Sequence, residues 1–240
     1  MSLLAAAGAI TNPVASTIYV EEDFTATTTG DLSDNNLTTD ELGGGWQGST
    51  GWTYGASNEG VCQSSQYSGG ARAGVVVQTD GREDVRVVCD MVIVNGSATD
   101  RWQGLSVRSA GAPTASDDGL TVRFNGAGTG PDLILLDGDI LTGTTLATWD
   151  LGSLMTTAPV ATDSVRLEIK CEGDVITLVS VGVNGAAPEV LDDAYTLTGA
   201  VATAHGAASG ADHYGLASSE RAADTTVERF EYFKVESIPA

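Results

Sequence analysis

Residues 165–172 read VRLEIKCE, a strict alternation of apolar and charged side chains. Successive residues of a β-strand point to opposite faces of a sheet, so Val165, Leu167, Ile169 and Cys171 are predicted to face a core. The charged residues between them are predicted to form a ladder on a solvent-exposed face, which is typical of an antiparallel sheet. The segment therefore indicates a sheet that is buried on one side.

A second stretch, VRVVCDMVIV at residues 85–94, is apolar on most of both faces, which is typical of a central strand. Shorter runs with the same period of two recur along the chain, separated by Gly, Asn and Asp. They predict further strands at residues 18–24, 74–78, 104–108, 120–125, 133–136, 146–151, 174–183 and 227–235.

The connections carry turn signals and show no helical period. Asn-Gly pairs at 95–96, 125–126 and 184–185 favour tight turns, because both residues adopt positive φ at little cost. The alanine-rich stretch 200–211 contains Thr, Gly and Ser at positions that favour a loop or a short turn. We therefore predict an all-β, two-sheet antiparallel sandwich with about 11–14 strands.

The chain divides into an N-terminal arm, residues 1–17, and a single β-sandwich domain, residues 18–240. One domain of this length is normal for a sandwich. The arm carries no charged side chain and lacks the basic start of a secretory signal, although a degenerate signal is the alternative. An apolar arm suits docking or oligomerisation. The candidate docking residues are Leu3, Leu4, Ile10, Pro13 and Val14.

The formal net charge is −21, from 32 acidic and 11 basic side chains in 240 residues. Binding to nucleic acid depends on Lys and Arg that displace counterions from phosphates, so this balance argues against a nucleic-acid partner. Anionic membrane surfaces should repel the chain, and no apolar run is long enough to span a bilayer. Much of the charge falls in turns and on solvent-facing positions of the predicted strands.

Cys62, Cys89 and Cys171 fit neither a zinc site nor a small disulfide framework, because their number is odd and their spacing wide. Cys89 and Cys171 occupy apolar positions of alternating strands and are predicted to be buried, reduced thiols. One disulfide with a leftover thiol is the alternative. Trp46 and Trp52 stand among glycines and are predicted to cover the edge of the core.

The order of several short motifs resembles the concanavalin A-like lectin/glucanase superfamily, in its laminin-G-like form. The resemblance covers about residues 18–236 and implies two curved antiparallel sheets in jelly-roll order. The family occurs in phage virion proteins and in carbohydrate-binding modules. The motifs are Glu22-Asp23-Phe24, the Trp46–Trp52 segment, Gly104-Leu105 with Arg108, Gly119-Leu120 with Arg123-Phe124, Leu167 to Asp174, Val183-Asn184-Gly185, Tyr214-Gly215-Leu216, and Phe230 with Phe233 and Val235.

No catalytic constellation is found. Glycosidases on this fold place paired carboxylates on one face of a strand, at a separation that suits the chemistry. Glu168 and Glu172 share a face, but Lys170 lies between them and favours an ion ladder; Glu228 and Glu231 fall on opposite faces of a regular strand. A nucleophile elbow and a phosphate loop are also missing from the sequence. We therefore predict no enzyme activity, with a glycosidase-like enzyme as the remote alternative.

No cofactor or metal site is assigned. His205 and His213 are interpreted as surface or packing histidines. Calcium, which needs six to eight oxygen ligands, is the ion that would suit this chain best. Its acidic clusters are Asp31/Asp34, Asp117/Asp118, Asp137/Asp139 and Asp192/Asp193. None follows a calcium-loop pattern, and Asp137-Gly138-Asp139 is predicted to be a hairpin turn.

A candidate glycan-binding face is formed by Trp102, Arg108 and Arg123. An aromatic platform beside a few polar groups is what carbohydrate recognition requires, and both arginines are expected to face the same way on adjacent strands. The alternative is that the arginines neutralise neighbouring acids and that Trp102 covers a sheet edge.

The favoured function is a non-catalytic structural protein of a bacteriophage virion: a capsid decoration protein, or a head- or tail-fibre module, that docks through its arm. Its expected partners are the major capsid protein or another virion protein and further copies of itself, with a host-surface glycan as a further partner. Such a protein is assembled in the host cytoplasm and located in the virion. The alternative is an extracellular carbohydrate-binding module or lectin.

Overall fold

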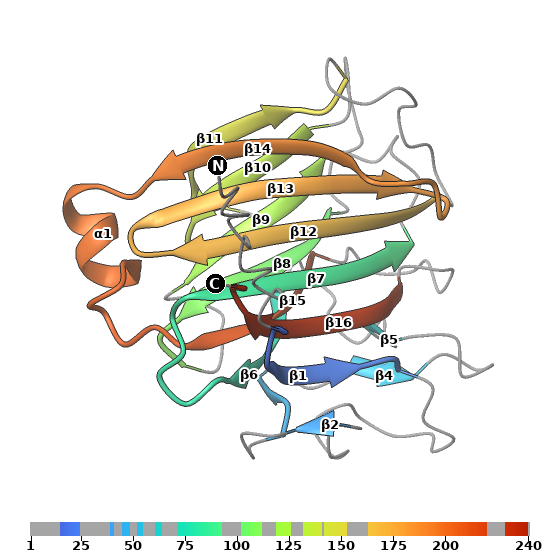
Figure 1. The fold of residues 1–240 in the computed structure, drawn as a ribbon, viewed down its shortest axis with the longest axis horizontal. Coiled ribbons are helices and arrows are strands. Elements are labelled where there is room, and N and C mark those ends of the chain that lie inside the picture. The colour runs from blue at the N-terminus through green and yellow to red at the C-terminus, as the bar shows by residue number, and fades with distance from the viewer. Residues whose placement is uncertain are drawn as a thin grey trace, which may run out of the picture.

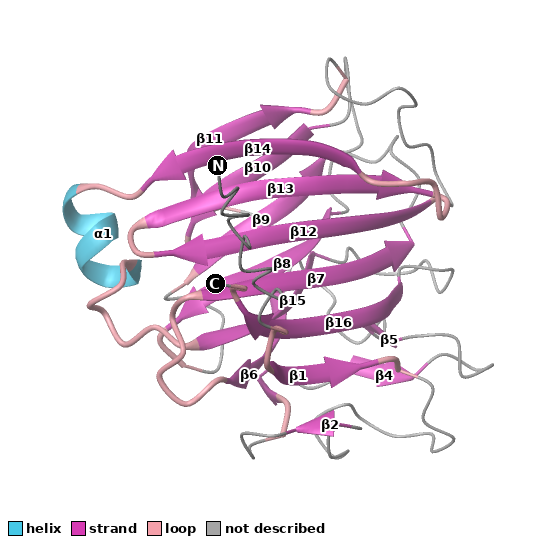
Figure 2. Ribbon diagram, viewed as in Figure 1, coloured by secondary structure: helices cyan, strands magenta, loops and turns pink. Residues whose placement is uncertain are grey.

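The computed structural model describes residues 15–24, 39–40, 45–48, 52–54, 61–63, 72–92, 102–111, 119–125, 132–140, 142–152, 163–219 and 229–239. Within these ranges there are sixteen strands and one short helix. The strands form two antiparallel sheets that pack face to face (Figures 1 and 2). The all-β jelly-roll sandwich predicted from the alternation is confirmed. No helix in the described ranges is long and apolar enough to cross a membrane.

The nine-stranded sheet, at the front of Figure 1, has the order β14-β13-β12-β7-β16-β1-β2, with β5 paired to β16 and β4 to β5. Its strands are β14 (Glu189–Thr196), β13 (Val175–Val183), β12 (Ser164–Glu172), β7 (Val85–Val92), β16 (Arg229–Ser237), β1 (Ile18–Glu22), β2 (Thr39–Asp40), β5 (Val61–Gln63) and β4 (Trp52–Tyr54).

The seven-stranded sheet lies behind it and has the order β11-β10-β9-β8-β15-β6-β3. Its strands are β11 (Thr144–Asp150), β10 (Asp132–Asp137), β9 (Leu120–Asn125), β8 (Trp102–Ser109), β15 (His213–Ser219), β6 (Arg72–Gln78) and β3 (Gln47–Gly48). Strands distant in sequence lie side by side in both sheets, as β7 and β16 do, so the chain crosses repeatedly between the layers.

The two stretches that predicted the fold lie next to each other in the centre of the nine-stranded sheet, because β12 pairs with β7. The inward-facing residues of both strands have no exposed surface, as the alternation required. On the outward face, Arg86 pairs with Glu168 at 2.6 Å and Lys170 with Glu172 at 3.1 Å. The predicted charge ladder and the central position of β7 are confirmed.

The core between the sheets contains an aromatic cluster at one edge. The ring of Trp46 lies 6.0 Å from that of Phe24 and 5.4 Å from that of Phe233, so this tryptophan covers the core as predicted. Cys89 and Cys171 are free, buried thiols. Burial raises the pKa of both thiols, that of Cys171 to about 12, so both stay protonated and unreactive. The side chains of Trp52 and Cys62 lie outside the described part of the structure.

The prediction of a loop or short turn after residue 199 is wrong, because helix α1 spans Gly199–His205. Two helical turns are too short to show a hydrophobic period, and the helix is stabilised by tertiary contacts instead. Val201 and Ala202 pack against the core, and His205 is buried. The strand count exceeds the predicted range because β2 to β5 have only two or three residues each, and because β14 and β15 were not predicted as strands.

Candidate functional site

Trp102 and Arg123 meet on the outer face of the seven-stranded sheet. Leu105 on β8 pairs with Val122 on β9, and both point into the core. Alternation therefore turns Trp102 and Arg123 outward. The guanidinium carbon of Arg123 lies 4.1 Å from the centroid of the Trp102 ring, which is a close cation–π contact. Both side chains are partly exposed.

Gly104 provides the space in which this contact forms. It lies directly opposite Arg123 in the β8–β9 pair and two residues from Trp102. A Cβ at this position would come within 2.1 Å of the Val122 carbonyl oxygen, so the two strands approach too closely for any side chain. The Arg123 side chain can therefore reach over Gly104 to the indole on the same strand.

The loop from β10 to β11 holds Arg123 in place. Arg123 Nη1 donates a hydrogen bond to the Ile140 carbonyl at 3.0 Å, and Thr121 Oγ1 donates one to the Gly138 carbonyl at 2.8 Å. Burial lowers the pKa of Arg123, and the charge of Asp139 partly offsets that effect. The side chain remains protonated at physiological pH, because an arginine pKa is far above neutral. The arrangement is therefore a fixed cation on an aromatic ring.

Arg108, the third residue of the predicted glycan face, lies elsewhere. The prediction placed it beside Arg123 on the outer face, but its side chain has no exposed surface. A β-bulge is the cause. Ser106 pairs with Gly215 and Ser109 pairs with His213, so β8 has one more residue than β15 between these two pairs. Arg108 has a φ of +52° at this bulge, and the extra residue redirects its side chain. Only Trp102 and Arg123 of the predicted set come together.

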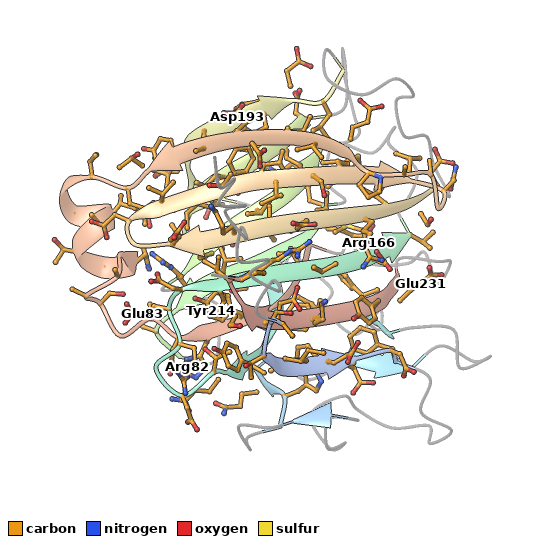
Figure 3. The ribbon with its side chains drawn as sticks, viewed as in Figure 1. Arg82, Glu83, Arg166, Asp193, Tyr214 and Glu231 are labelled. Atoms are coloured by element: carbon orange, nitrogen blue, oxygen red, sulfur yellow. The ribbon has the colours of Figure 1, made fainter. Side chains whose placement is uncertain are left out.

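The guanidinium of Arg108 joins three segments at the end of the sandwich, beside α1. It donates hydrogen bonds to the carbonyls of Gly173 (2.5 Å), His205 (3.2 Å) and Glu83 (3.1 Å). Tyr214 Oη also donates to the Glu83 carbonyl, at 3.0 Å, and Glu83 and Tyr214 are seen together in Figure 3. The guanidinium also lies 3.5 Å from the Asp84 carboxylate, but its three shorter contacts are backbone carbonyls, which is typical of a structural role.

The other candidate groups also have structural partners. His205 and His213 are buried, as the packing interpretation predicted, with ring nitrogens 3.3 Å from Asp137 and 2.8 Å from Asp212. Asp139 accepts hydrogen bonds from the backbone and hydroxyl of Thr142, so the turn predicted there is confirmed. Within the described residues, no three His, Cys, Asp or Glu side chains are placed to hold a metal ion. The acidic clusters before residue 119 lie outside them.

Sequence reasoning missed a cleft of about 370 Å³ on the outer face of the nine-stranded sheet. Its polar lining comes from Asp90, Ser164, Arg166 and Glu231, and the loop from β13 to β14 contributes Ala187 and Pro188. Arg166 and Glu231 lie at the end of this sheet away from α1 (Figure 3). The available signal was the Val-Asn-Gly-Ala-Ala-Pro run at 183–188, which marks a loop folding back on its strand.

The predicted docking residues Leu3 to Val14 lie outside the described part of the chain. The last residues of the predicted arm are described, and they contact the end of β16. Ser16 Oγ donates a hydrogen bond to Glu236 at 2.7 Å. Thr17 donates to the Ser237 hydroxyl and accepts from the Ser237 backbone, each at 2.8 Å. The start of the sandwich is therefore fixed at Ser16.

Comparison with solved structures finds several proteins to which this chain is similar. A CBM2 module of the evolved Dit of Lactobacillus casei BL23 phage J-1 matches at 10% identity and a TM-score of 0.49, over 94% of this chain and 97% of that chain. A bifunctional GH43-CE protein of Bacteroides eggerthii matches at 13% and 0.51, over 98% of this chain but 27% of that one. The VIP36 exoplasmic/lumenal domain in its Ca²⁺/Man-bound form matches at 12% and 0.49, over 80% and 82%.

These identities are low, and the likeness concerns the fold alone. The chain spans about a quarter of the Bacteroides eggerthii protein, whose match has the higher TM-score of the three. No protein-family model matches the sequence, and neither does any curated protein. The two-sheet jelly-roll architecture is supported by the structure itself, and function has to be argued from the side chains.

Proposed function

We propose that this protein is a non-catalytic glycan-binding module, and that Trp102 and Arg123 form part of its contact surface. The observation that carries the proposal is the 4.1 Å stack of the Arg123 guanidinium on the Trp102 ring, partly exposed on the outer face of a sheet. An aromatic ring gives the apolar face of a sugar a flat surface, and a guanidinium gives its hydroxyls several donors.

The geometry favours binding because the contact is formed before a ligand arrives. Arg123 is held by the Ile140 carbonyl and by the indole, so little side-chain entropy remains to be lost on binding. Gly104 places no side chain between Arg123 and the ring, so nothing displaces the guanidinium from the indole. Sheet strands are also more rigid supports for a ligand contact than loops.

The absence of catalysis is part of the proposal and rests on how the described carboxylates are used. Glu168 is paired with Arg86 and accepts a hydrogen bond from Ser180 at 3.2 Å, so the Glu168/Glu172 pair has a structural role. Glycoside hydrolysis needs two carboxyl groups facing one scissile bond. Measurable turnover of any polysaccharide that the protein binds would overturn this part.

The test is binding of the full chain to a glycan array, followed by titration of the best ligand. Trp102→Ala is expected to weaken binding at least tenfold, and Trp102→Phe, which keeps an aromatic ring, to weaken it less. Tyr19→Ala removes a partly exposed aromatic side chain in the other sheet and serves as the matched control. A wild-type protein that binds no glycan would refute the proposal, as would a Trp102→Ala variant that binds as well as wild type.

We further propose virion attachment as the setting in which this module acts. The fixed start of the sandwich at Ser16 supports it, because residues before that point would leave the surface from one defined place beside β16. The expected docking residues are Leu3, Leu4, Ile10, Pro13 and Val14. Deletion of residues 1–14 is expected to abolish co-purification with assembled phage particles and to leave the thermal midpoint unchanged. Retained co-purification would refute the role of the arm.

A further inference from the structure

The cleft on the nine-stranded sheet lies on the opposite side of the sandwich from Trp102 and Arg123. Its floor is a row of residues that face each other across three adjacent strands: Gly182 on β13 pairs with Arg166 on β12, which pairs with Asp90 on β7. Its volume of about 370 Å³ is at the lower end of the range seen for ligand pockets, about 300–1,000 Å³. A ligand of one or two small rings would suit it.

The wall of the cleft is apolar and closely packed. A Cβ on Gly182 would lie 3.3 Å from the Ala186 carbonyl oxygen and 3.4 Å from Pro188 Cγ. The loop from β13 to β14 therefore folds back over a strand position that carries no side chain. Ala186, Ala187 and Pro188 form an apolar wall above the charged floor.

The floor presents a hydrogen-bond donor and an acceptor side by side. Arg166 Nη1 donates to Asp90 Oδ2 at 3.1 Å, and the two side chains are 46% and 27% exposed, so both can still contact a ligand. Arg166 also lies over the Tyr232 ring, 5.7 Å from its centroid, which limits its movement. The pair is therefore a preorganised polar contact.

Glu231 reaches the same cleft because of a β-bulge. Phe230 and Tyr232 pair with the consecutive residues Met91 and Asp90, so Glu231 is the extra residue between them. Its charge raises the pKa of Asp90, although burial is the larger cause and Arg166 opposes both. With two carboxylates and one guanidinium, the cleft disfavours anionic ligands.

We propose that this cleft is a second saccharide site, in which a sugar ring packs on the apolar wall while neighbouring hydroxyls bind Asp90 and Arg166. A hydroxyl both donates and accepts hydrogen bonds, so two adjacent hydroxyls complement a carboxylate beside a guanidinium. A neutral sugar can bind the donors and acceptors that Asp90 and Arg166 do not use for each other, so their ion pair stays intact.

The inference goes beyond the proposed function, because it gives one chain two glycan contacts on opposite faces. A module of this kind could join two glycan chains, or gain avidity when several copies are displayed together. The two sites share no described residue, so each can be removed without the other.

The experiment uses saturation-transfer difference NMR on the full chain, with the methyl glycosides of glucose, galactose, mannose, xylose and arabinose as probes. Trp102→Ala serves as the background, so that only the second site remains. At least one glycoside is expected to keep its signal in this background. Adding Arg166→Ala, or Ala187→Leu, which fills the cleft and leaves the ion pair intact, is expected to weaken that binding at least tenfold.

Arg82→Ala is the matched control, because Arg82 is also an exposed arginine beside an aromatic ring, 5.4 Å from that of Tyr19. It is expected to leave the signal unchanged, and thermal midpoints verify that every variant is folded. If Trp102→Ala loses all binding that wild type shows, the second site is refuted and the proposed function stands. If Trp102→Ala binds as well as wild type and Arg166→Ala does not, the second site stands and the first is refuted. Binding of glucosamine alone would indicate a cation site and overturn the inference.

Discussion

Arginines lie both at the end of the sandwich beside α1, which we call the closed end, and on the outer faces of the two sheets. Their partners differ between the two regions. At the closed end, Arg108 has no exposed surface and donates to the backbone carbonyls of three segments. On the outer faces, Arg123 lies on an indole ring and Arg86 pairs with Glu168 and Glu236. The closest partners are backbone carbonyls in the first region, whereas in the second they are mainly side chains, with the Ile140 carbonyl as the exception.

This difference distinguishes an arginine that stabilises the fold from arginines that can contact a ligand. Backbone carbonyls cannot move away or be mutated, so a buried guanidinium that satisfies three of them connects the loops that bear them. Side-chain partners on a partly exposed face leave donors and ring surface for a ligand, and they respond to pH and salt. The comparison therefore predicts that loss of an arginine changes stability at the closed end and binding on the outer faces.

The largest expected effect is that of Arg108→Met. The variant leaves the carbonyls of Gly173 and His205 without this donor in a largely buried site and removes one of the two donors to the Glu83 carbonyl. We expect a loss of about 3–5 kcal/mol of unfolding free energy. For a chain of this size, that loss corresponds to a fall of roughly 10 °C in thermal midpoint. Urea denaturation followed by tryptophan fluorescence measures it.

Arg82→Met is the control for this prediction, because Arg82 is exposed and lies close in sequence to the same cluster. Its loss is expected to be within about 0.5 kcal/mol of zero. Equal losses for the two variants would contradict a special role for the closed end.

An intermediate effect is expected for Glu236→Gln on the outer face of the nine-stranded sheet. Burial alone would raise the pKa of Glu236, but hydrogen bonds from Ser16 and Lys234, with the charges of Lys234 and Arg86, outweigh burial and hold this pKa below its usual value. The carboxylate therefore stabilises the fold above its unfolded pKa of about 4.3, and this contribution is lost as pH falls through the lower folded value.

We expect Glu236→Gln to lose about 1.5 kcal/mol at pH 7 and to converge with wild type as the pH falls through the lowered folded-state pKa of Glu236. Urea titrations at several pH values measure the difference. A difference that stays constant from pH 7 to pH 3 would show that the charge of Glu236 is not what matters. Glu172→Gln, at a more exposed ion pair, is the control and should change stability by less than about 1 kcal/mol at any pH.

The same comparison shows what could be predicted from sequence. The strand at Val165–Glu172 could be predicted from its alternating apolar and charged residues, because a period of two with one buried face determines which side chains point inward. Arg108 and Glu231 were misplaced or missed because each stands at a β-bulge, and one extra residue reverses the face on which a side chain lies. Neither bulge carries a glycine or another signal in the sequence.

Trp102 and Arg123 were predicted together because the register between their strands is regular at that point. Helix α1 could not be foreseen, since its stability comes from contacts with distant residues and not from its own seven residues. The sequence therefore allows a prediction of regular strand pairing. It does not reveal the β-bulges that place Arg108 and Glu231.

Among the variants at Arg108, Glu236 and Arg123, the smallest loss of stability is expected for Arg123→Met. This variant tests whether Arg123 serves ligand binding and not folding. The variant loses one partly exposed cation–π contact and one hydrogen bond to the Ile140 carbonyl, while its side chain can still cover Gly104. We expect a loss of about 1 kcal/mol, little changed between pH 5 and pH 8, because neither partner of Arg123 titrates there. Glycan binding should weaken at least fivefold in the same variant, as measured by titration with the best array ligand. A loss as large as that of Arg108→Met, with binding retained, would make Arg123 a structural residue and remove the distinction between the closed end and the outer faces.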